Sequence, residues 1–208
     1  MGSKILNIAI LLIVVLLLQP FTGLADQWPA PKPQHVVSTN GTYLVRIVPG
    51  ESWGDTFGFT GSKKGAYARG EFYKKQADRS FTLMADAPLQ NPVAPVHLLL
   101  SDQGYLVTFD NWHNAGYGKA VAIYKPNGAL LRSYEVEELY PAKRVEEVPQ
   151  SVSSRHWLSN NHGFYPGSDE RMVYAYDFRG GLFLFALPTG NFEYLEGGQQ
   201  QLLETMKP

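Results

Sequence analysis

Short apolar runs separated by tight polar turns dominate the middle of the chain. Between Val96 and Val136 the runs VHLLL, YLVTFD, KAVAIYK and ALLRSYEV follow one another. The first two are separated by Ser101–Gly104, and the last two by Pro-Asn-Gly at 126–128. Asn-Gly between apolar runs is a strong hairpin signal, because both central positions of that turn need a positive φ. The pattern therefore predicts four antiparallel strands in this region.

Two further segments show a similar pattern. The runs QHVV, TYLVRIVP, GAYARGEFYK and FTLMADA predict four strands up to about Ala87. Near the end, RMVYAYD, LFLFAL and NFEYL predict three strands, and SRHWL (Ser154–Leu158) is the candidate for a fourth. The turns Ser38–Gly41 and Ser101–Gly104 share the spacing Ser-x-x-Gly, which indicates a degenerate internal repeat. Helix is expected only at EVEELY (135–140) and QQQLLETM (199–206).

One four-stranded antiparallel sheet in every 40–45 residues or so is typical of β-propeller blades. The stretches LLLSDQGYLVTFD and VAIYKPNGALLRSYEV resemble propeller repeats of the WD or YVTN type. The chain departs from that pattern in having no Pro in SDQG, Lys125 where the family often has Asp, and no Trp-Asp dipeptide. The resemblance implies an all-β, propeller-like array of about three four-stranded antiparallel sheets, and it carries no catalytic residues.

Three sheets are fewer than a closed propeller needs, since four to eight blades are usual. We therefore expect an open array, or self-association that protects the sheet edges. A two-sheet sandwich or a small barrel would also accommodate the predicted strands.

The N-terminus predicts an export signal, residues 1–25. Lys4 precedes the 14-residue apolar run Ile5–Leu18, and the small residues Gly23 and Ala25 follow, so cleavage is expected after Ala25. A membrane span needs roughly 20 apolar residues, and this run is shorter, although retention as an anchor stays an alternative. Residues 26–34 contain three prolines and predict an extended lead-in, followed by a single β-rich domain at 35–208.

Composition narrows the partners and the compartment. The 208-residue chain is 44% apolar and 18% charged, has no Cys, and carries a net charge of −1. A fold without disulfides must be held by a buried core, and a near-neutral chain lacks the basic face that nucleic acids require. We expect a periplasmic or extracellular protein that binds neither nucleic acid nor, once the signal is cleaved, a membrane.

The stretch FDNWHNAGYGKA (109–120) is the best candidate for a binding site. It is expected to link two strands at one rim of the sheets, with glycines that let the chain reverse. Aromatic faces beside directed amide and imidazole groups suit a sugar ring or an extended peptide. The loop could equally be an ordinary connector. The candidate ligand-binding residues are Asp110, Asn111, Trp112, His113, Asn114 and Tyr117.

Catalytic and metal-binding alternatives have fewer supporting residues. GESWG (Gly50–Gly54) matches the Gly-x-Ser-x-Gly nucleophile motif with Ser52 at its centre, but a glycine-rich segment follows where that motif needs a helix. In SVSSRHW, we expect the serines to make turn hydrogen bonds and Trp157 to pack in the core. No set of three or four ligands has the short spacing of known metal sites, so neither metal nor cofactor is expected.

These observations favour a non-catalytic binding or interaction module whose partner is a glycan, a peptide or a protein. One alternative is a secreted serine-type hydrolase that uses Ser52, or the Asp110/His113 pair. A second is a structural envelope protein without a small ligand.

Overall fold

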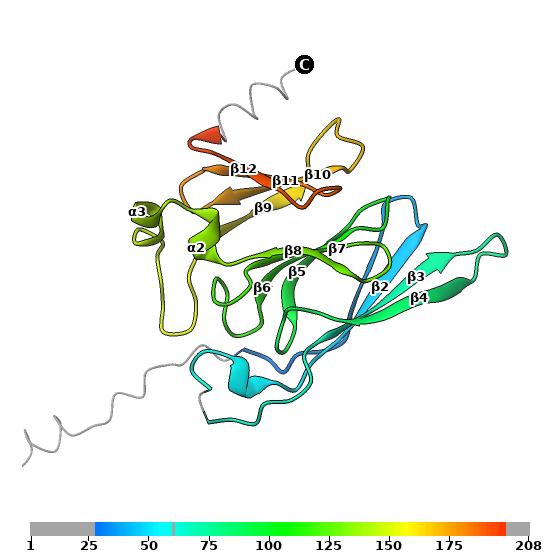
Figure 1. Cartoon of the computed structure of the whole chain (residues 1–208), viewed down its shortest axis with the longest axis horizontal. Coiled ribbons are helices and arrows are strands. Elements are labelled where there is room, and N and C mark those ends of the chain that lie inside the picture. Colours follow the sequence, from blue (N-terminus) through cyan, green and yellow to red (C-terminus); the bar gives the residue numbers. More distant parts are fainter. Residues whose placement is uncertain (1–27, 60, 199–208) are drawn as a thin grey trace, which may run out of the picture.

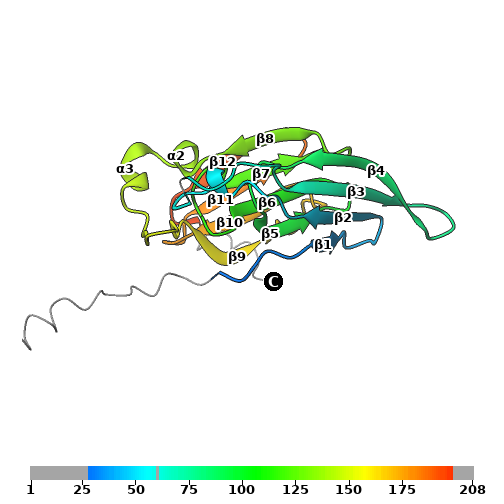
Figure 2. The ribbon, with the colours of Figure 1, turned by 90° about the horizontal axis from the view of Figure 1, so that it is seen from below.

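The computed structural model describes residues 28–59 and 61–198, which form three four-stranded antiparallel sheets (Figure 1). Among these residues, no helix is long and apolar enough to cross a membrane. Each sheet is built from four consecutive strands, and Figure 2 shows β1 to β4 and β5 to β8 in chain order across their sheets. The first sheet contains β1 (Gln34–Val37), β2 (Tyr43–Val48), β3 (Arg69–Lys75) and β4 (Phe81–Pro88). The second contains β5 (Pro95–Leu100), β6 (Leu106–Asn111), β7 (Val121–Tyr124) and β8 (Leu130–Tyr134). The third contains β9 (Leu158–Phe164), β10 (Met172–Asp177), β11 (Leu182–Ala186) and β12 (Phe192–Leu195).

The second sheet lies between the other two, and its strand alternation explains how (Figure 1). On β7, Val121 and Ile123 pack against residues of the third sheet, whereas Ala122 and Tyr124 pack against the first. Successive side chains of a strand point to opposite faces, so both faces of this strand are covered and all four residues are buried. The central sheet therefore has apolar residues at consecutive positions and provides the core for both interfaces.

Three hairpin turns, one from each sheet, meet at a turn junction. The backbone N–H of Asn40, in the β1–β2 turn, donates to Asp102 Oδ1 in the β5–β6 turn at 2.7 Å. Glu170, in the β9–β10 turn, accepts from Thr39 Oγ1 at 2.9 Å and from the backbone N–H of Asp102 at 2.5 Å. The turn junction thus links all three sheets through side chains that are distant in sequence.

Most predicted strands are confirmed, as are the mostly β composition and the three four-stranded sheets. The expected short helix near 135–140 is α2 (Val136–Leu139), whose start is stabilised by a capping box between Glu135 and Glu138. Two elements were not anticipated, η1 (Trp53–Asp55) and α3 (Ala142–Val145). The predicted helix at 199–206 lies outside the described residues.

The prediction of a strand at Ser154–Leu158 was wrong. The fourth strand of the last sheet is β9, which only begins at Leu158. Backbone groups of the preceding residues bond to loops instead of β10: Arg155 N–H donates to Ala115 O and His156 N–H to Pro149 O, at 2.8 and 2.7 Å. Trp157 is fully buried in the core, as expected.

Candidate functional site

The loop between β6 and β7 is held from beneath by Asp110. The Asp110 carboxylate is buried, and its Oδ1 accepts hydrogen bonds from Gly116 N–H and from Trp157 Nε1, each at 2.7 Å. Burial raises the pKa of Asp110 to about 6, outweighing the opposite effect of the two hydrogen bonds. Asp110 therefore anchors the loop and is not among the residues that line the pocket described below.

The rest of the loop presents side chains in two directions. Asp110 and His113 have positive φ angles of 59° and 69°, a conformation that Asp, Asn and His tolerate better than most residues. These reversals separate the predicted site residues into two groups. Asn111, Asn114 and Tyr117 line a pocket, whereas Trp112 and His113 join an aromatic cluster beside it.

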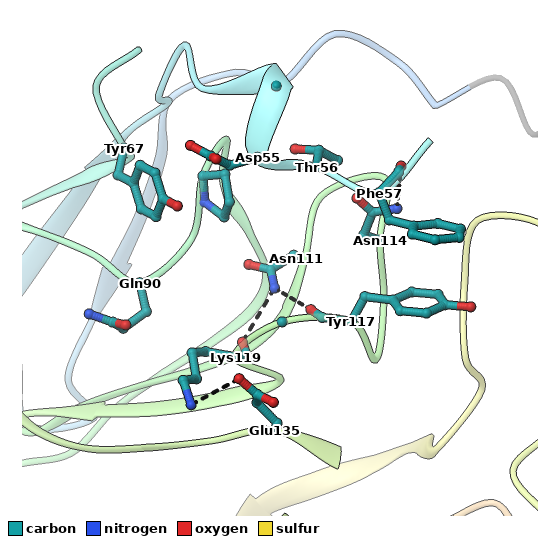
Figure 3. Close-up of a pocket in the computed structure, with 13 residues that line it drawn as sticks. Asp55, Thr56, Phe57, Tyr67, Gln90, Asn111, Asn114, Tyr117, Lys119 and Glu135 are labelled. Carbon is teal, nitrogen blue, oxygen red and sulfur yellow. Dashed lines mark hydrogen bonds and ion pairs between the residues drawn. The ribbon is translucent and has the colours of Figure 1, made fainter. Parts of the chain in front are cut away.

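The pocket is a cavity of about 450 Å³ between this loop and the loop at 50–65 (Figure 3). Residues of both loops line it, with the rings of Phe57 and Tyr117 turned away from the other lining side chains, and α2 contributes through the residue at its N-cap. Its lining residues are Gly54, Asp55, Thr56, Phe57, Tyr67, Gln90, Pro92, Asn111, Asn114, Tyr117, Gly118, Lys119 and Glu135.

A stacked aromatic pair at the edge of the pocket is fixed in position. The rings of Phe57 and Tyr117 are stacked, with centroids 4.7 Å apart and planes at 8°. Asn114 Nδ2 donates to the carbonyls of Phe57 and Ser153 at 3.0 and 3.2 Å, which fastens the two loops together. The Arg155 guanidinium lies 4.7 Å from the Tyr117 ring centroid, within the range of a cation–π interaction.

The polar groups of the pocket divide into satisfied and unsatisfied ones. Asn111 is used internally: its Nδ2 donates to Tyr117 O at 2.6 Å, and its Oδ1 accepts from Asn91 Nδ2 at 2.8 Å. In contrast, Thr56 Oγ1 and Asn114 Oδ1 are buried and have no hydrogen-bond partner among the described residues. A buried polar group left unpaired costs about 1–3 kcal/mol. A ligand that donates hydrogen bonds to these oxygens would recover that free energy.

Two ion pairs balance the charge at the pocket. Lys64 Nζ lies 2.5 Å from Asp55 Oδ1, and Lys119 Nζ lies 3.1 Å from Glu135 Oε1. The hydrogen bond from Lys64, followed by that from Ser52, holds the pKa of Asp55 below its usual value. The carboxylates of Asp55 and Glu135 are therefore each paired with a lysine.

Ser52 is placed as a loop-fixing residue. Its side chain is fully buried, and its hydroxyl donates to Asp55 Oδ2 at 2.6 Å and accepts from Gly65 N–H at 3.0 Å. The single 3-10 turn η1 follows it, where a nucleophile elbow would have an α-helix. A serine nucleophile needs a general base beside it, and among the described residues no imidazole forms a hydrogen bond with Ser52. The nucleophile role of Ser52 stays a prediction.

The aromatic cluster surrounds His113 on the other side of the loop. The imidazole centroid lies 4.8 Å from Trp53, 5.5 Å from Phe59 and 5.5 Å from Trp28. Trp112 contacts Trp28 edge to face at 5.3 Å. Burial lowers the pKa of His113, which favours its neutral form. We use the name aromatic cluster for Trp28, Trp53, Phe59, Trp112 and His113.

Sequence reasoning missed the half of the pocket that comes from outside the β6–β7 loop. Thr56 and Phe57 belong to the glycine-rich segment after the GESWG motif, and Glu135 lies at the start of the predicted helix at 135–140; neither segment was predicted to bind a ligand. The alternation of Phe and Gly in TFGFTG was the available signal, because exposed aromatic residues on a flexible loop often contact ligands.

In the described part of the chain, no group of three or more His, Asp or Glu residues could hold a metal ion. Comparison with protein-family models and with curated protein sequences found no match.

Proposed function

We propose that the protein is an exported, non-catalytic binding module that holds a hydroxyl-rich ligand, a glycan, in the pocket between the two loops. The observation that carries this proposal is the pair of buried, unpartnered oxygens, Thr56 Oγ1 and Asn114 Oδ1. A sugar hydroxyl can donate to either oxygen, and threonine can also donate in return. The ligand would thus complete a hydrogen-bond arrangement that the protein leaves incomplete.

The shape and the chemistry of the pocket support a sugar ring as the ligand. The stacked Phe57–Tyr117 pair adds apolar surface at the edge of the pocket, and the neighbouring amides provide direction. A volume of about 450 Å³ is within the range of small-ligand sites. Because the nearby carboxylates are paired with lysines, the site favours a ligand without a large net charge.

Two features support binding without turnover. Asp55 has a lowered pKa and is paired with Lys64, so it is a poor proton donor at neutral pH. Asp110, whose pKa is raised, is buried beneath the loop and is bonded to Trp157 and Gly116. General acid catalysis needs the acid within hydrogen-bond reach of the substrate, and Asp110 is not among the lining residues.

The proposal is tested with a panel of oligosaccharides and peptidoglycan fragments, measured by thermal shift and then by calorimetry, on the wild type and Thr56→Val. A ligand at about 100 times its Kd should stabilise the protein by roughly 2.7 kcal/mol. Removing the Thr56 hydroxyl should weaken the ligand about tenfold, or roughly 1.4 kcal/mol. Without ligand, the variant should be as stable as the wild type or more so, because it removes an unpaired buried group.

Thr82→Val is the matched control, since Thr82 is exposed on β4 of the first sheet. Its ligand affinity should equal that of the wild type. The proposal fails if no glycan shifts the melting temperature, or if Thr56→Val binds as tightly as the control. Stabilisation by peptides alone would assign the pocket to a peptide, and ligand cleavage abolished by Ser52→Ala would instead support the hydrolase.

A further inference from the structure

The aromatic cluster is only partly covered, and a lysine lines each of the two grooves beside it. Phe59 is 38% exposed, and the neighbouring Phe57 on the same loop is 55% exposed. One shallow groove beside the cluster is lined by Trp28, Trp53, Phe59 and Lys63, among others, and a second by Trp112 and Lys32. Exposed aromatic rings and lysines thus share one surface, which we call the aromatic-lysine surface.

The lead-in chain reaches the folded part at this surface. Trp112 Nε1 donates to Pro29 O at 3.0 Å, and Trp28 packs on Trp112. Figure 1 shows the start of the described chain (blue) and the loop at 50–65 (cyan) at the same end of the molecule. In the sequence, the apolar run Ile5–Leu18 ends ten positions before Trp28. That length of chain spans at most about 35 Å when extended.

Contrary to the expectation from composition that the cleaved protein binds no membrane, we propose that the aromatic-lysine surface binds the surface of a membrane that contains anionic lipids. Aromatic residues concentrate at the membrane–water interface, where an apolar ring can enter the headgroup region while polar atoms remain hydrated. Lysines beside them are attracted to anionic headgroups. The apolar N-terminal run brings this end of the molecule to a membrane during export, or holds it there if the run is retained.

A lipid surface fits the observations better than a protein partner does. The exposed rings of Phe57 and Phe59 flank Gly58, which has a positive φ of 84°, on a loop that can enter a soft headgroup layer. Lys63 lines one of the two grooves and Lys32 the other, and two separate lysines suit many equivalent anionic headgroups. Phe57 belongs to both surfaces, but Phe59 and Lys63 do not line the pocket, so variants of these two residues test this inference separately from the proposed function.

The chain itself supplies the probe for the test. It has four tryptophans; three belong to the aromatic cluster, and Trp157 is fully buried in the core. Quenching of tryptophan fluorescence by brominated lipids therefore reports on this surface. The protein beginning at Asp26 is suitable, since it contains both buried clusters that join the three sheets. It would be mixed with brominated vesicles of phosphatidylcholine alone, or of phosphatidylcholine with phosphatidylglycerol.

The expected result is quenching by the anionic vesicles, with weaker quenching by the neutral ones and at high salt. Phe59→Ser combined with Lys63→Gln should weaken vesicle binding roughly tenfold. Leu83→Ser, which changes a 50% exposed side chain on β4, should leave it unchanged. The proposal is overturned if anionic vesicles do not quench the fluorescence. That result is expected if the natural partner of this surface is a protein and the surface has no affinity for lipid. It is also overturned if the double variant is quenched as strongly as the wild type. Glycan affinity measured on the same samples separates these outcomes from a failure of the pocket proposal.

Discussion

Replacement of Asp110 by Asn tests whether the buried carboxylate anchors the β6–β7 loop at a cost in stability. Asparagine keeps an Oδ1 that can accept from Gly116 N–H and Trp157 Nε1, and it tolerates the positive φ of 59° at this position. The substitution therefore removes the charge while it preserves the shape and both acceptor contacts. We expect Asp110→Asn to be more stable than the wild type at neutral pH.

The size and sign of the effect follow from the pKa of Asp110, which is about 6 in the folded protein against an ordinary value of 3.8. At about 1.36 kcal/mol for each tenfold change in proton affinity, this difference corresponds to roughly 3 kcal/mol. A folded-state pKa that is raised means that the folded protein binds the proton more tightly. The stabilisation that the folded protein gains from protonated Asp110 is therefore fully present below pH 3.8 and is lost as the pH rises through 6.

The assay is thermal unfolding of the wild type and Asp110→Asn between pH 4 and pH 8. For a domain of this size, 3 kcal/mol corresponds to roughly 6–12 °C. The variant should melt higher at pH 7.5, and the two curves should converge toward pH 4. Other titrating groups are common to both proteins and cancel in the difference. A lower melting temperature for the variant at pH 7.5, or a difference that does not change with pH, would refute the reasoning.

Two further predictions concern a tight turn and a pair of histidines. Gly116→Ala should lower the free energy of unfolding in urea by about 3 kcal/mol, because φ is +73° and the new Cβ would lie 2.6 Å from Arg155 O. Gly167→Ala, which has the same φ but no atom near the new Cβ, should lower it by only about 1 kcal/mol. Equal costs would contradict the proposed clash. His97 and His162 face each other with ring centroids 4.7 Å apart, and burial lowers the pKa of both below 6.5, so their contribution to stability is present above pH 6.5 and is lost as the pH falls. His97→Phe should reduce the fall in melting temperature on acidification below pH 6.5, and an unchanged fall would count against this assignment.

The sheets were predictable from the sequence wherever turns and strands agreed. Gly41 and Gly104 occupy positive-φ positions that glycine adopts without strain, so the Ser-x-x-Gly turns located two hairpins correctly. β9 was missed because SNNHG has neither β-branched residues nor alternation. Its pairing with β10, for example Ala175 opposite His162, places these polar residues in a sheet that their own propensities do not favour.

The candidate site was predictable only on one side. The β6–β7 loop was located from its polar and aromatic residues, and it does join two strands at a rim. The opposite orientations of Asn114 and His113 depend on backbone angles that the sequence does not reveal. Thr56 and Phe57 reach the pocket through the fold of the first sheet and its long β2–β3 connection, a relation between segments more than 50 residues apart.

The sequential order of strands within each sheet has a consequence for how the chain folds. Every strand pairs only with its immediate neighbours along the chain, so each sheet can form from a contiguous segment without waiting for distant residues. The first sheet can assemble as soon as its own four strands have emerged from the ribosome. The second must follow before the apolar faces of the first and third can be covered. The hydrogen bonds from Thr39 and Asp102 to Glu170 join turns of all three sheets, so they can form only when all three sheets are in place.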